Sequence, residues 1–168
     1  RQRFDIVLNN LAGFAYTIGE IRMTSDGSPW RPITHIEDIC EAMLCALKAP
    51  KDAVAGEAFN VGADSENYRI REIAEIVAKT FPGCALTIGD SGGDTRSYRV
   101  SFDKIERGLS GFSPCWTAAA GADELARLFK RIAFDRQTYE FRAFTRLKQL
   151  KHLQSTGQLD NDLNWSAR

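Results

Sequence analysis

Histidine, paired cysteines and long apolar runs are all scarce in this sequence. Its 168 residues include 2 His and 4 Cys, and no two cysteines form a Cys-x-x-Cys pair. A structural zinc site needs closely spaced ligands, and a disulfide framework is typical of short secreted chains. We therefore expect no metal site and no disulfides. The four cysteines are interpreted as small core hydrophobes of a reducing, cytoplasmic protein: Cys40, Cys45, Cys84 and Cys115.

An excess of charge of either sign is also absent. Lys plus Arg and Asp plus Glu each total 22, so the net charge at pH 7 is zero. Nucleic acids and anionic membranes bind mainly to basic proteins, so neither is expected as the main partner. Apolar stretches such as residues 39–47 are shorter than the roughly 20 residues that a membrane span requires. Because the sequence opens on Arg1 without a secretory signal, we expect it to be part of a longer protein.

What is present is the pattern of a folded domain, with 43% hydrophobic and 26% charged residues. Apolar spacing of three and four residues predicts helices, and short alternating or compact apolar runs predict strands. Residues 20–24 and 30–33 are expected to form a hairpin or two neighbouring strands. Because helices and strands alternate, the fold class is predicted to be α/β. Helices are expected over residues 4–16, 34–49, 70–81 and 121–134, and strands over 20–24, 30–33, 58–61, 85–88 and 98–102.

The helix after residue 33 has a start signal of its own. Thr34 followed by Glu37 resembles a capping box, and Pro50 ends the pattern. One face of this helix is predicted to be apolar: Ile36, Ile39, Cys40, Met43, Leu44 and Leu47. His35 is interpreted as a helix-start residue that hydrogen-bonds a loop, and Asp38 as a first-turn charge that favours the helix dipole. No Ser-His-Asp arrangement is predicted.

Residues 135–168 differ in composition from residues 1–134 and are treated as a separate segment. Basic residues (Arg136, Arg142, Arg146, Lys148, Lys151) alternate with apolar ones (Phe141, Phe144, Leu147, Leu150), and a polar tail follows from Gly157. The pattern predicts an amphipathic basic helix. Such a helix either offers a surface to an anion or acidic partner, or lays its basic stems along apolar surface with the charged heads in water. The second interpretation is favoured.

Residues 89–93, Gly-Asp-Ser-Gly-Gly, invite a phosphate-loop interpretation. A phosphate loop opens directly onto a helix N-terminus, where free N–H groups point at the anion. The residues that follow, 96–100, look extended, so the Walker and dinucleotide-binding interpretations both fail. A loop that delivers Arg96 or Arg99 to a ligand stays open, because a guanidinium binds phosphate through two parallel hydrogen bonds. The alternative is a solvated turn.

Three segments taken together carry a family resemblance. Residues 25–39 read Ser-Asp-Gly-Ser-Pro-Trp-Arg-Pro-Ile-Thr-His-Ile-Glu-Asp-Ile, residues 59–62 read Phe-Asn-Val-Gly, and residues 93–98 read Gly-Asp-Thr-Arg-Ser-Tyr, with Lys104 beyond. In order and approximate spacing, residues 1–130 resemble the C-terminal part of NAD-dependent nucleotide-sugar epimerases and dehydratases, which are extended short-chain dehydrogenases. The resemblance implies the substrate-binding lobe of a Rossmann-type enzyme, over residues 1–134, with the cofactor-binding half missing.

The resemblance also implies roles for single residues. Arg31 matches the arginine that contacts the substrate diphosphate, and its alternative interpretation is a surface arginine stacked on Trp30. Tyr98 matches an aromatic residue near the sugar, and Asn9 matches an asparagine in the helix that borders the nucleotide pocket. The strand containing Ile21 is expected to lie against the base.

Departures from the family pattern qualify this picture. Ser91 stands where the family has a second diphosphate-binding arginine, so Arg96 or Arg99 is expected to substitute. Pro32 replaces the usual Asp after the key arginine, which removes a donor. The glycine fingerprint for NAD and the Tyr and Lys of proton transfer do not occur, so no catalytic or cofactor-binding residue is predicted in this chain.

The implied function is therefore the substrate-binding part of an NAD(P)-dependent nucleotide-sugar epimerase or dehydratase, inactive and without NAD or NADP when alone. Its ligand would be a nucleotide-diphosphate sugar, and the full-length parent would be a homodimer. Two alternatives stay open: a stand-alone interaction module that uses the basic helix, and a nucleotide-sugar sensor without turnover. In the resembled family the helix near Ile36 and the strand at residues 58–61 pack against the cofactor half, so their apolar surface should lack its cover here.

Overall fold

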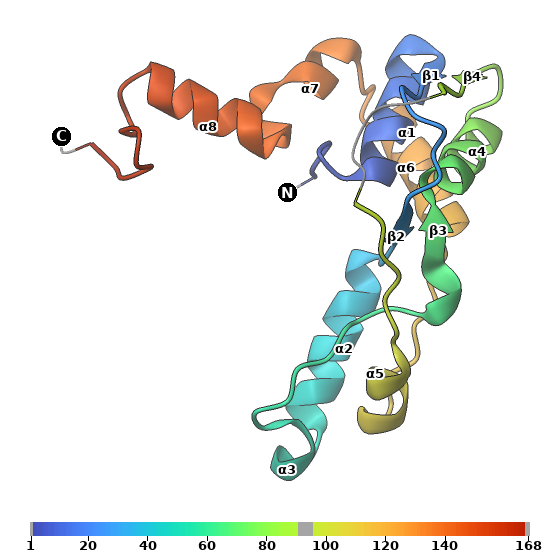
Figure 1. Cartoon of the computed structure of the whole chain (residues 1–168), viewed down its shortest axis with the longest axis vertical. Helices are drawn as coiled ribbons and strands as arrows, with labels where there is room; N and C mark the ends of the chain where they lie inside the picture. The colour runs from blue at the N-terminus through green and yellow to red at the C-terminus, as the bar shows by residue number, and fades with distance from the viewer. Residues whose placement is uncertain (1, 91–95, 167–168) are drawn as a thin grey trace.

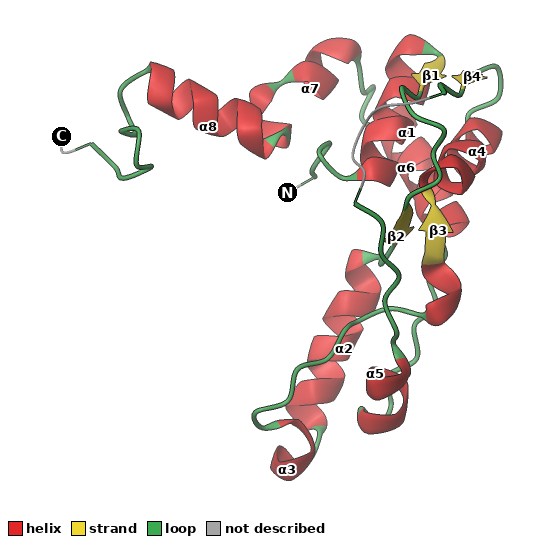
Figure 2. Cartoon of the chain, in the orientation of Figure 1, coloured by secondary structure: helices red, strands yellow, loops and turns green. Residues whose placement is uncertain are grey.

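Helices dominate the computed structural model, which describes residues 2–90 and 96–166 (Figures 1 and 2). The α-helices are α1 (Val7–Ile18), α2 (Ile36–Lys48), α3 (Lys51–Val54), α4 (Ile70–Thr80), α5 (Asp103–Gly108), α6 (Ala118–Arg131), α7 (Arg136–Glu140) and α8 (Arg146–Ser155). The strands are β1 (Glu20–Arg22), β2 (Trp30–Pro32), β3 (Asn67–Arg69) and β4 (Ala85–Thr87), and two 3-10 turns are η1 (Asp64–Glu66) and η2 (Arg142–Phe144). The α/β class is confirmed. No helix among the described residues is long and apolar enough to cross a membrane.

The four strands form two separate two-stranded sheets. β1 pairs with β4 in parallel, with Ile21 opposite Leu86, and β2 pairs with β3 antiparallel, with Arg31 opposite Tyr68. The predicted pairing of residues 20–24 with 30–33 is therefore wrong. Each strand finds its partner far along the chain, and local alternation carries no information about which partner that is.

The main core lies where α1, α4 and α6 pack together beneath β1 and β4. Its fully buried side chains include Ile21, Ile73, Val77 and Phe129. Phe4, which precedes α1, packs against Phe134 with tilted rings whose centroids are 5.4 Å apart. The helix predicted at residues 4–16 is present but shifted by two to three residues, and the one predicted at 70–81 starts where expected and ends one residue earlier. Gly19 ends α1 in the left-handed conformation (φ 74°). The predicted third helix, α6, starts three residues earlier than expected.

A second, smaller core stabilises an arm that extends away from this body in Figure 1. We call it the α2 arm; it consists of α2, α3 and α5. Its buried residues are Ala42, Cys45, Phe102, Ile105, Leu109 and Phe112. Residues 58–61, predicted to be a strand, run through this region without a ladder partner, and residues 98–102 likewise form no regular strand. Their apolar side chains pack on the second core. An extended segment can bury its apolar side chains in this way without joining a sheet.

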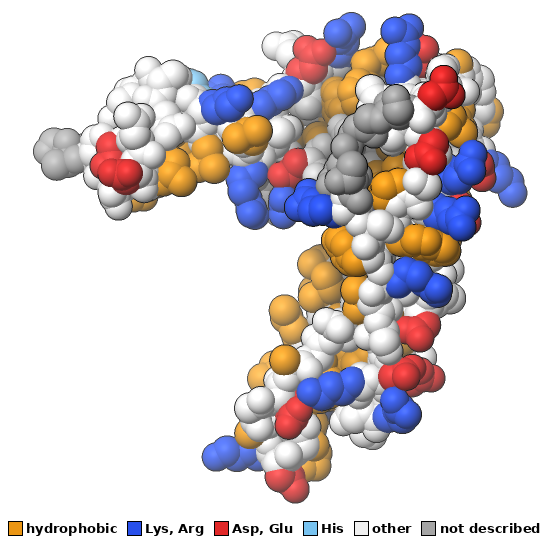
Figure 3. Space-filling view, viewed as in Figure 1, with side chains coloured by type: hydrophobic (Ala, Val, Ile, Leu, Met, Phe, Trp, Pro, Cys, Tyr) orange, Lys and Arg blue, Asp and Glu red, His pale blue; other side chains and the backbone are white. Residues whose placement is uncertain are grey.

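The outer face of α2 is uncovered. Ile36 and Met43 are each 62% exposed and Leu47 is 83% exposed, whereas the buried residues of this helix are Asp38, Ala42 and Cys45. The predicted apolar face exists, and it points to solvent. Figure 3 shows apolar side chains gathered along this side of the α2 arm. The exposure agrees with the expectation for this helix, whereas Phe59 and Val61 of residues 58–61 pack on the second core.

The cap of α2 differs from the prediction. The His35 Nδ1 accepts a hydrogen bond of 3.2 Å from the Glu37 N–H, so His35 is the N-cap. Thr34 is engaged elsewhere, because its hydroxyl donates to the Val61 carbonyl over 3.0 Å. A side chain with a tertiary partner is no longer available for the local cap that the capping-box pattern predicts.

The cysteines are only partly the core residues that were expected. All four are free thiols; Cys45 is buried and Cys84 is half-buried, but Cys40 and Cys115 are exposed. Cys40 belongs to the uncovered face of α2, which explains the error. In the part of the chain that the structure describes, no group of His, Cys, Asp or Glu could hold a metal ion.

The segment after residue 134 is not one continuous helix. It is broken into α7, η2 and α8, and α8 projects away from the body and packs mainly against η2 (Figure 1). No residue of α8 is buried, and Leu147 is 60% exposed. The chain is anchored just before α8, where the Phe4 N–H donates to the Phe144 carbonyl over 2.9 Å.

Candidate functional site

Three extended pieces of chain meet at the junction of the body and the α2 arm. β2 and β3 form one ladder, and the outer edge of β2 is covered by residues 96–100, which we call the site segment. The Trp30 N–H donates to the Ser97 hydroxyl oxygen over 3.1 Å, and the Tyr98 N–H donates to the Trp30 carbonyl over 3.4 Å. Residues from distant parts of the sequence are thereby brought to one place.

Arg31 lies at the centre of this junction. Its Nη1 donates to the carbonyl of Trp30 over 2.7 Å and to the carbonyl of Arg96. Its guanidinium carbon is 4.9 Å from the centroid of the Tyr98 ring. The structure thus brings three of the predicted site residues together: Arg31, Arg96 and Tyr98. The alternative in which Arg31 stacks on Trp30 is wrong, because neighbouring residues of a strand point to opposite faces.

Two other arginine side chains lie over the Trp30 ring. The guanidinium carbon of Arg99 is 4.8 Å from the Trp30 ring centroid, and that of Arg69 is 5.3 Å away. Within residues 2–90 and 96–166, no carboxylate oxygen lies within 4.0 Å of either guanidinium. Arg69 was not predicted, and the sequence offers no signal for it, since its proximity to Trp30 depends on the cross-strand register.

Asn9 occupies a different place. Its side-chain amide donates to the Arg3 carbonyl over 2.9 Å, and it lines a cavity of about 670 Å³ together with Thr34, His35 and Glu124. Arg31 does not line this cavity. The structure therefore does not join Asn9 to the arginines, and its predicted role receives no geometric support here.

Both ring nitrogens of His35 have hydrogen-bond partners. Besides the Nδ1 cap, its Nε2 is 2.8 Å from a carboxylate oxygen of Glu124, and its ring stacks on Trp116 with centroids 3.8 Å apart. Both ring nitrogens are used in the structure. This confirms His35 as a helix-start residue, but its partner Glu124 lies in α6 rather than in a loop.

Two buried carboxylates tie the α2 arm and β3 to the start of α6. Asp38 accepts hydrogen bonds from the N–H groups of Cys115 (3.1 Å) and Trp116 (3.3 Å). Glu66 accepts one from the Ala118 N–H over 2.8 Å and one from the Tyr68 hydroxyl over 2.9 Å. Asp38 thus has a structural partner beyond the helix dipole, and both carboxylates hold backbone in place.

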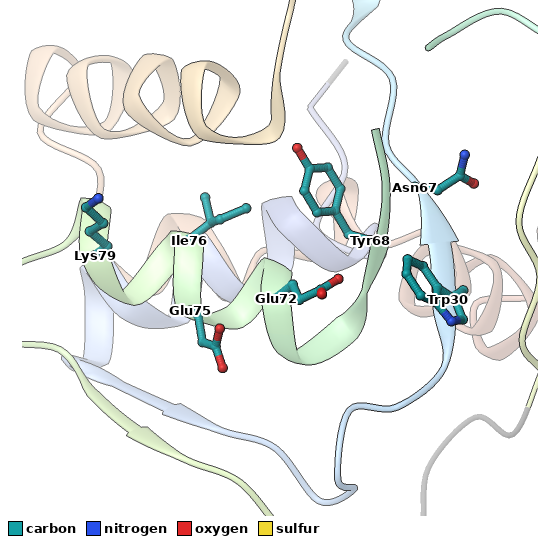
Figure 4. A pocket seen from close by; sticks show the side chains of 7 residues that line it. All are labelled: Trp30, Asn67, Tyr68, Glu72, Glu75, Ile76 and Lys79. Carbon is teal, nitrogen blue, oxygen red and sulfur yellow. The ribbon is translucent and has the colours of Figure 1, made fainter. Parts of the chain in front are cut away.

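A second cavity, of about 490 Å³, opens between β3 and α4 (Figure 4). Trp30, Asn67 and Tyr68 line one side, and Glu72, Glu75, Ile76 and Lys79 of α4 line the other. Burial and the hydrogen bond to Glu66 raise the pKa of Tyr68 to about 12, so its hydroxyl stays protonated at neutral pH. Glu72 caps α4 by accepting from the Arg69 N–H over 2.6 Å.

The described residues do not fit a bound NAD. A dinucleotide site needs a strand that runs through a glycine-rich turn into a helix N-terminus. The one described strand that leads directly into a helix is β3, and Arg69 rather than glycine stands at the start of α4. Ser91, where the family has its second arginine, lies outside the described residues.

Comparison with known proteins identifies the fold. Residues 4–62 match the NAD dependent epimerase/dehydratase family, a stretch that includes Asn9 and Arg31. A solved UDP-glucuronic acid 4-epimerase from Bacillus cereus, in complex with UDP-glucuronic acid and NAD, is 22% identical over 79% of this chain, with a TM-score of 0.63. The resemblance drawn from the motifs is confirmed.

Two further structures agree. DesIV, a dTDP-glucose 4,6-dehydratase from Streptomyces venezuelae with NAD and TYD bound, is 22% identical over 77% of this chain, with a TM-score of 0.61. The Helicobacter pylori ADP-L-glycero-D-manno-heptose-6-epimerase is 21% identical over 74%, with a TM-score of 0.59. This chain spans 42%, 40% and 36% of the three structures. It therefore has the fold of a part of these longer Rossmann-type enzymes.

Proposed function

We propose that this chain is the substrate-binding part of an NAD(P)-dependent nucleotide-sugar epimerase or dehydratase, and that Arg31 holds the diphosphate of the substrate. The observation that carries the proposal is the placement of the Arg31 guanidinium between the Arg96 carbonyl and the Tyr98 ring. A diphosphate is a compact double anion, and guanidinium groups meet it with paired, charge-assisted hydrogen bonds. Arg31 also falls within the stretch that matches the family.

The position of Arg31 supports this role. The carbonyls of Trp30 and Arg96 accept from its Nη1, and Tyr98 packs against the guanidinium. Such contacts fix the orientation of a long side chain before a ligand arrives, which lowers the entropy lost on binding. The proposed ligand is a nucleotide-diphosphate sugar, which the solved relatives make reasonable; no nucleic acid is proposed as a partner.

Catalysis is assigned to a full-length parent, proposed to be a cytoplasmic homodimer that supplies NAD or NADP and the proton-transfer groups. No residue of this chain is proposed as catalytic. We expect the chain alone neither to bind NAD nor to turn over a nucleotide sugar. Titration of NAD into the purified chain, followed by fluorescence, tests this, and saturable micromolar binding would contradict it.

The diphosphate site is tested by calorimetric titration of UDP into this chain without substitutions, which we call the parent chain, and into Arg31→Ala. Charge-assisted hydrogen bonds predict a loss of roughly tenfold to a hundredfold in affinity. Arg107→Ala is the matched control, because Arg107 is exposed and pairs with Asp103 on α5, away from the site. If Arg31→Ala binds UDP as tightly as the parent chain, or the parent chain does not bind it, the proposal is wrong.

A further inference from the structure

Main-chain bonding holds the site segment only weakly where it borders β2. Its one backbone hydrogen bond to that strand, from the Tyr98 N–H to the Trp30 carbonyl, is 3.4 Å long, near the limit for such a bond. Two side-chain bonds also link the segment to β2: the Trp30 N–H donates to the Ser97 hydroxyl oxygen, and the Arg31 Nη1 donates to the Arg96 carbonyl. All three links involve residues 96–98, so none of them fixes the backbone beyond Tyr98.

Asn67 supplies the missing anchor from β3. Its Oδ1 accepts from the Val100 N–H over 2.9 Å, and its Nδ2 donates to the Val100 carbonyl over 3.0 Å and to the Asp64 carbonyl over 3.1 Å. Asn67 is 8% exposed. A side-chain amide offers the same donor and acceptor as a peptide group, so this contact replaces one rung of a β-ladder. Figure 4 shows the Asn67 amide directed away from α4.

The two residues between these anchors carry the site chemistry. Tyr98 and Arg99 are the two residues immediately before Val100. Because the Asn67 amide fixes the backbone at Val100, it also fixes the directions in which the side chains of Tyr98 and Arg99 leave the backbone. Tyr98 lies against the guanidinium of Arg31, and Arg99 lies over the ring of Trp30. Loss of the anchor would free both contacts together.

We infer that Asn67 is a positioning residue of the diphosphate site: its amide sets the site segment so that Tyr98 orders Arg31 and Arg99 stays on Trp30. The ligand half of this inference, that Asn67 supports diphosphate binding, rests on the proposed function. The positional half, that Asn67 holds Tyr98 and Arg99 in place, is measurable without any ligand.

The ligand half is tested by titrating UDP into Asn67→Ala. We expect about tenfold weaker binding, as for loss of one to two hydrogen bonds that orient the site. Asn60→Ala is the matched control, because Asn60 is also an asparagine that bonds this stretch of chain, but it is exposed and its bond to the Ser101 carbonyl is 3.4 Å long. It should bind UDP as the parent chain does.

The positional half is tested by the fluorescence of Trp30 alone. In a background with Trp116→Phe and Trp165→Phe, Trp30 is the single tryptophan left. Asn67→Ala should change the emission of Trp30 and its quenching by acrylamide in the same direction as Arg99→Ala, because both remove the stacked guanidinium. Asn60→Ala should leave them unchanged.

Asn67→Asp gives a conservative rescue with its own signature. A protonated carboxyl has a donor and an acceptor, as the amide has, whereas an ionised carboxylate has acceptors only and faces the carbonyls of Val100 and Asp64. At pH 7 this variant should therefore resemble Asn67→Ala. Near pH 4, roughly the ordinary pKa of an aspartate, its Trp30 emission should return toward that of the parent background measured at the same pH.

The outcomes separate the two hypotheses. If the parent chain does not bind UDP, the proposed function fails, and the Trp30 measurements still decide whether Asn67 positions the segment. A folded Asn67→Ala with unchanged Trp30 emission overturns the inference. If Asn67→Ala does not fold, Asn67→Asp decides: the same emission at both pH values overturns the inference, and recovery in acid supports it.

Discussion

The carboxylate of Glu66, which ends η1, accepts a hydrogen bond of 2.8 Å from the N–H of Ala118, the first residue of α6. The two residues are separated by 52 positions in the sequence, and both are buried. The same carboxylate accepts from the Tyr68 hydroxyl. One side chain thus joins the β2–β3 ladder, which carries the candidate site, to the helix that completes the main core.

Glu66→Ala should lower the free energy of unfolding by about 2–3 kcal/mol, because it leaves a buried N–H and a half-buried hydroxyl without an acceptor. Urea denaturation followed by circular dichroism measures this. Glu106→Ala, on the exposed side of α5, is the control and should change stability by less than about 0.5 kcal/mol. Equal effects of the two substitutions would show that the Glu66 contact contributes nothing.

Arg96 and Arg99 should differ in their effect on UDP binding. The backbone carbonyl of Arg96 accepts from the Arg31 guanidinium, whereas the Arg99 side chain is directed to Trp30. We expect Arg96→Ala to weaken binding several-fold and Arg99→Ala to have a smaller effect. Arg31→Lys should recover only part of the affinity lost in Arg31→Ala, because an ammonium lacks the planar fork. Calorimetry on the four variants checks the order, and a larger loss in Arg99→Ala than in Arg96→Ala would reverse it.

Gly62→Ala should destabilise the junction between body and α2 arm. Gly62 has φ 153°, and an added Cβ would lie 2.7 Å from the Phe102 ring and 2.9 Å from the Thr34 hydroxyl oxygen. Strain and overpacking together predict a loss of roughly 2–3 kcal/mol in unfolding free energy. Gly56→Ala separates the two causes, because Gly56 has φ 77° but nothing within 4 Å of its added Cβ. A thermal melt should show the larger loss for Gly62→Ala.

The uncovered face of α2 should make the isolated chain associate or bind a hydrophobic dye, because contiguous apolar surface of several hundred Å² drives association. Met43→Lys with Leu47→Lys should reduce both signals. Leu147→Lys, at another exposed leucine on α8, is the matched control and should reduce them less. A monomer by light scattering at high concentration, with no dye signal, would contradict the prediction.

Stability should fall between pH 10 and about pH 12. The pKa of Tyr68 is raised to about 12 in the folded chain, chiefly by burial and also by its bond to Glu66, against an ordinary value of 10.0. A pKa that is raised on folding means that the folded state favours the neutral tyrosine. The stability that Tyr68 contributes is therefore complete below pH 10 and is lost as the pH rises toward 12. Ultraviolet titration of tyrosinate in parent and Tyr68→Phe checks this: the variant should lack one late-titrating group. A Tyr68 that titrates near pH 10 would refute the assignment.

Local spacing determined the principal helices. Apolar spacing of three and four residues predicted α1, α4 and α6, because the side chains that a helix buries recur with the period of the helix. The repeats are Leu8 and Leu11, Ile73 and Val77, and Leu125 and Phe129. The same spacing predicted the apolar face of α2. The motifs around Arg31 also sufficed for the family resemblance that the comparisons confirm.

The tertiary structure decided everything that depends on a distant partner. β1 pairs with β4 rather than with β2. The Thr34 hydroxyl bonds the Val61 carbonyl, so His35 caps α2 instead. The Arg99 side chain lies over Trp30, and that of Arg31 lies over Tyr98. Periodicity states which face of an element is apolar but not which segment will cover it. Strand partners, side-chain anchors such as that of Asn67 to Val100, and the convergence of arginines are set by contacts between residues tens of positions apart, and only the folded chain brings those residues within bonding distance.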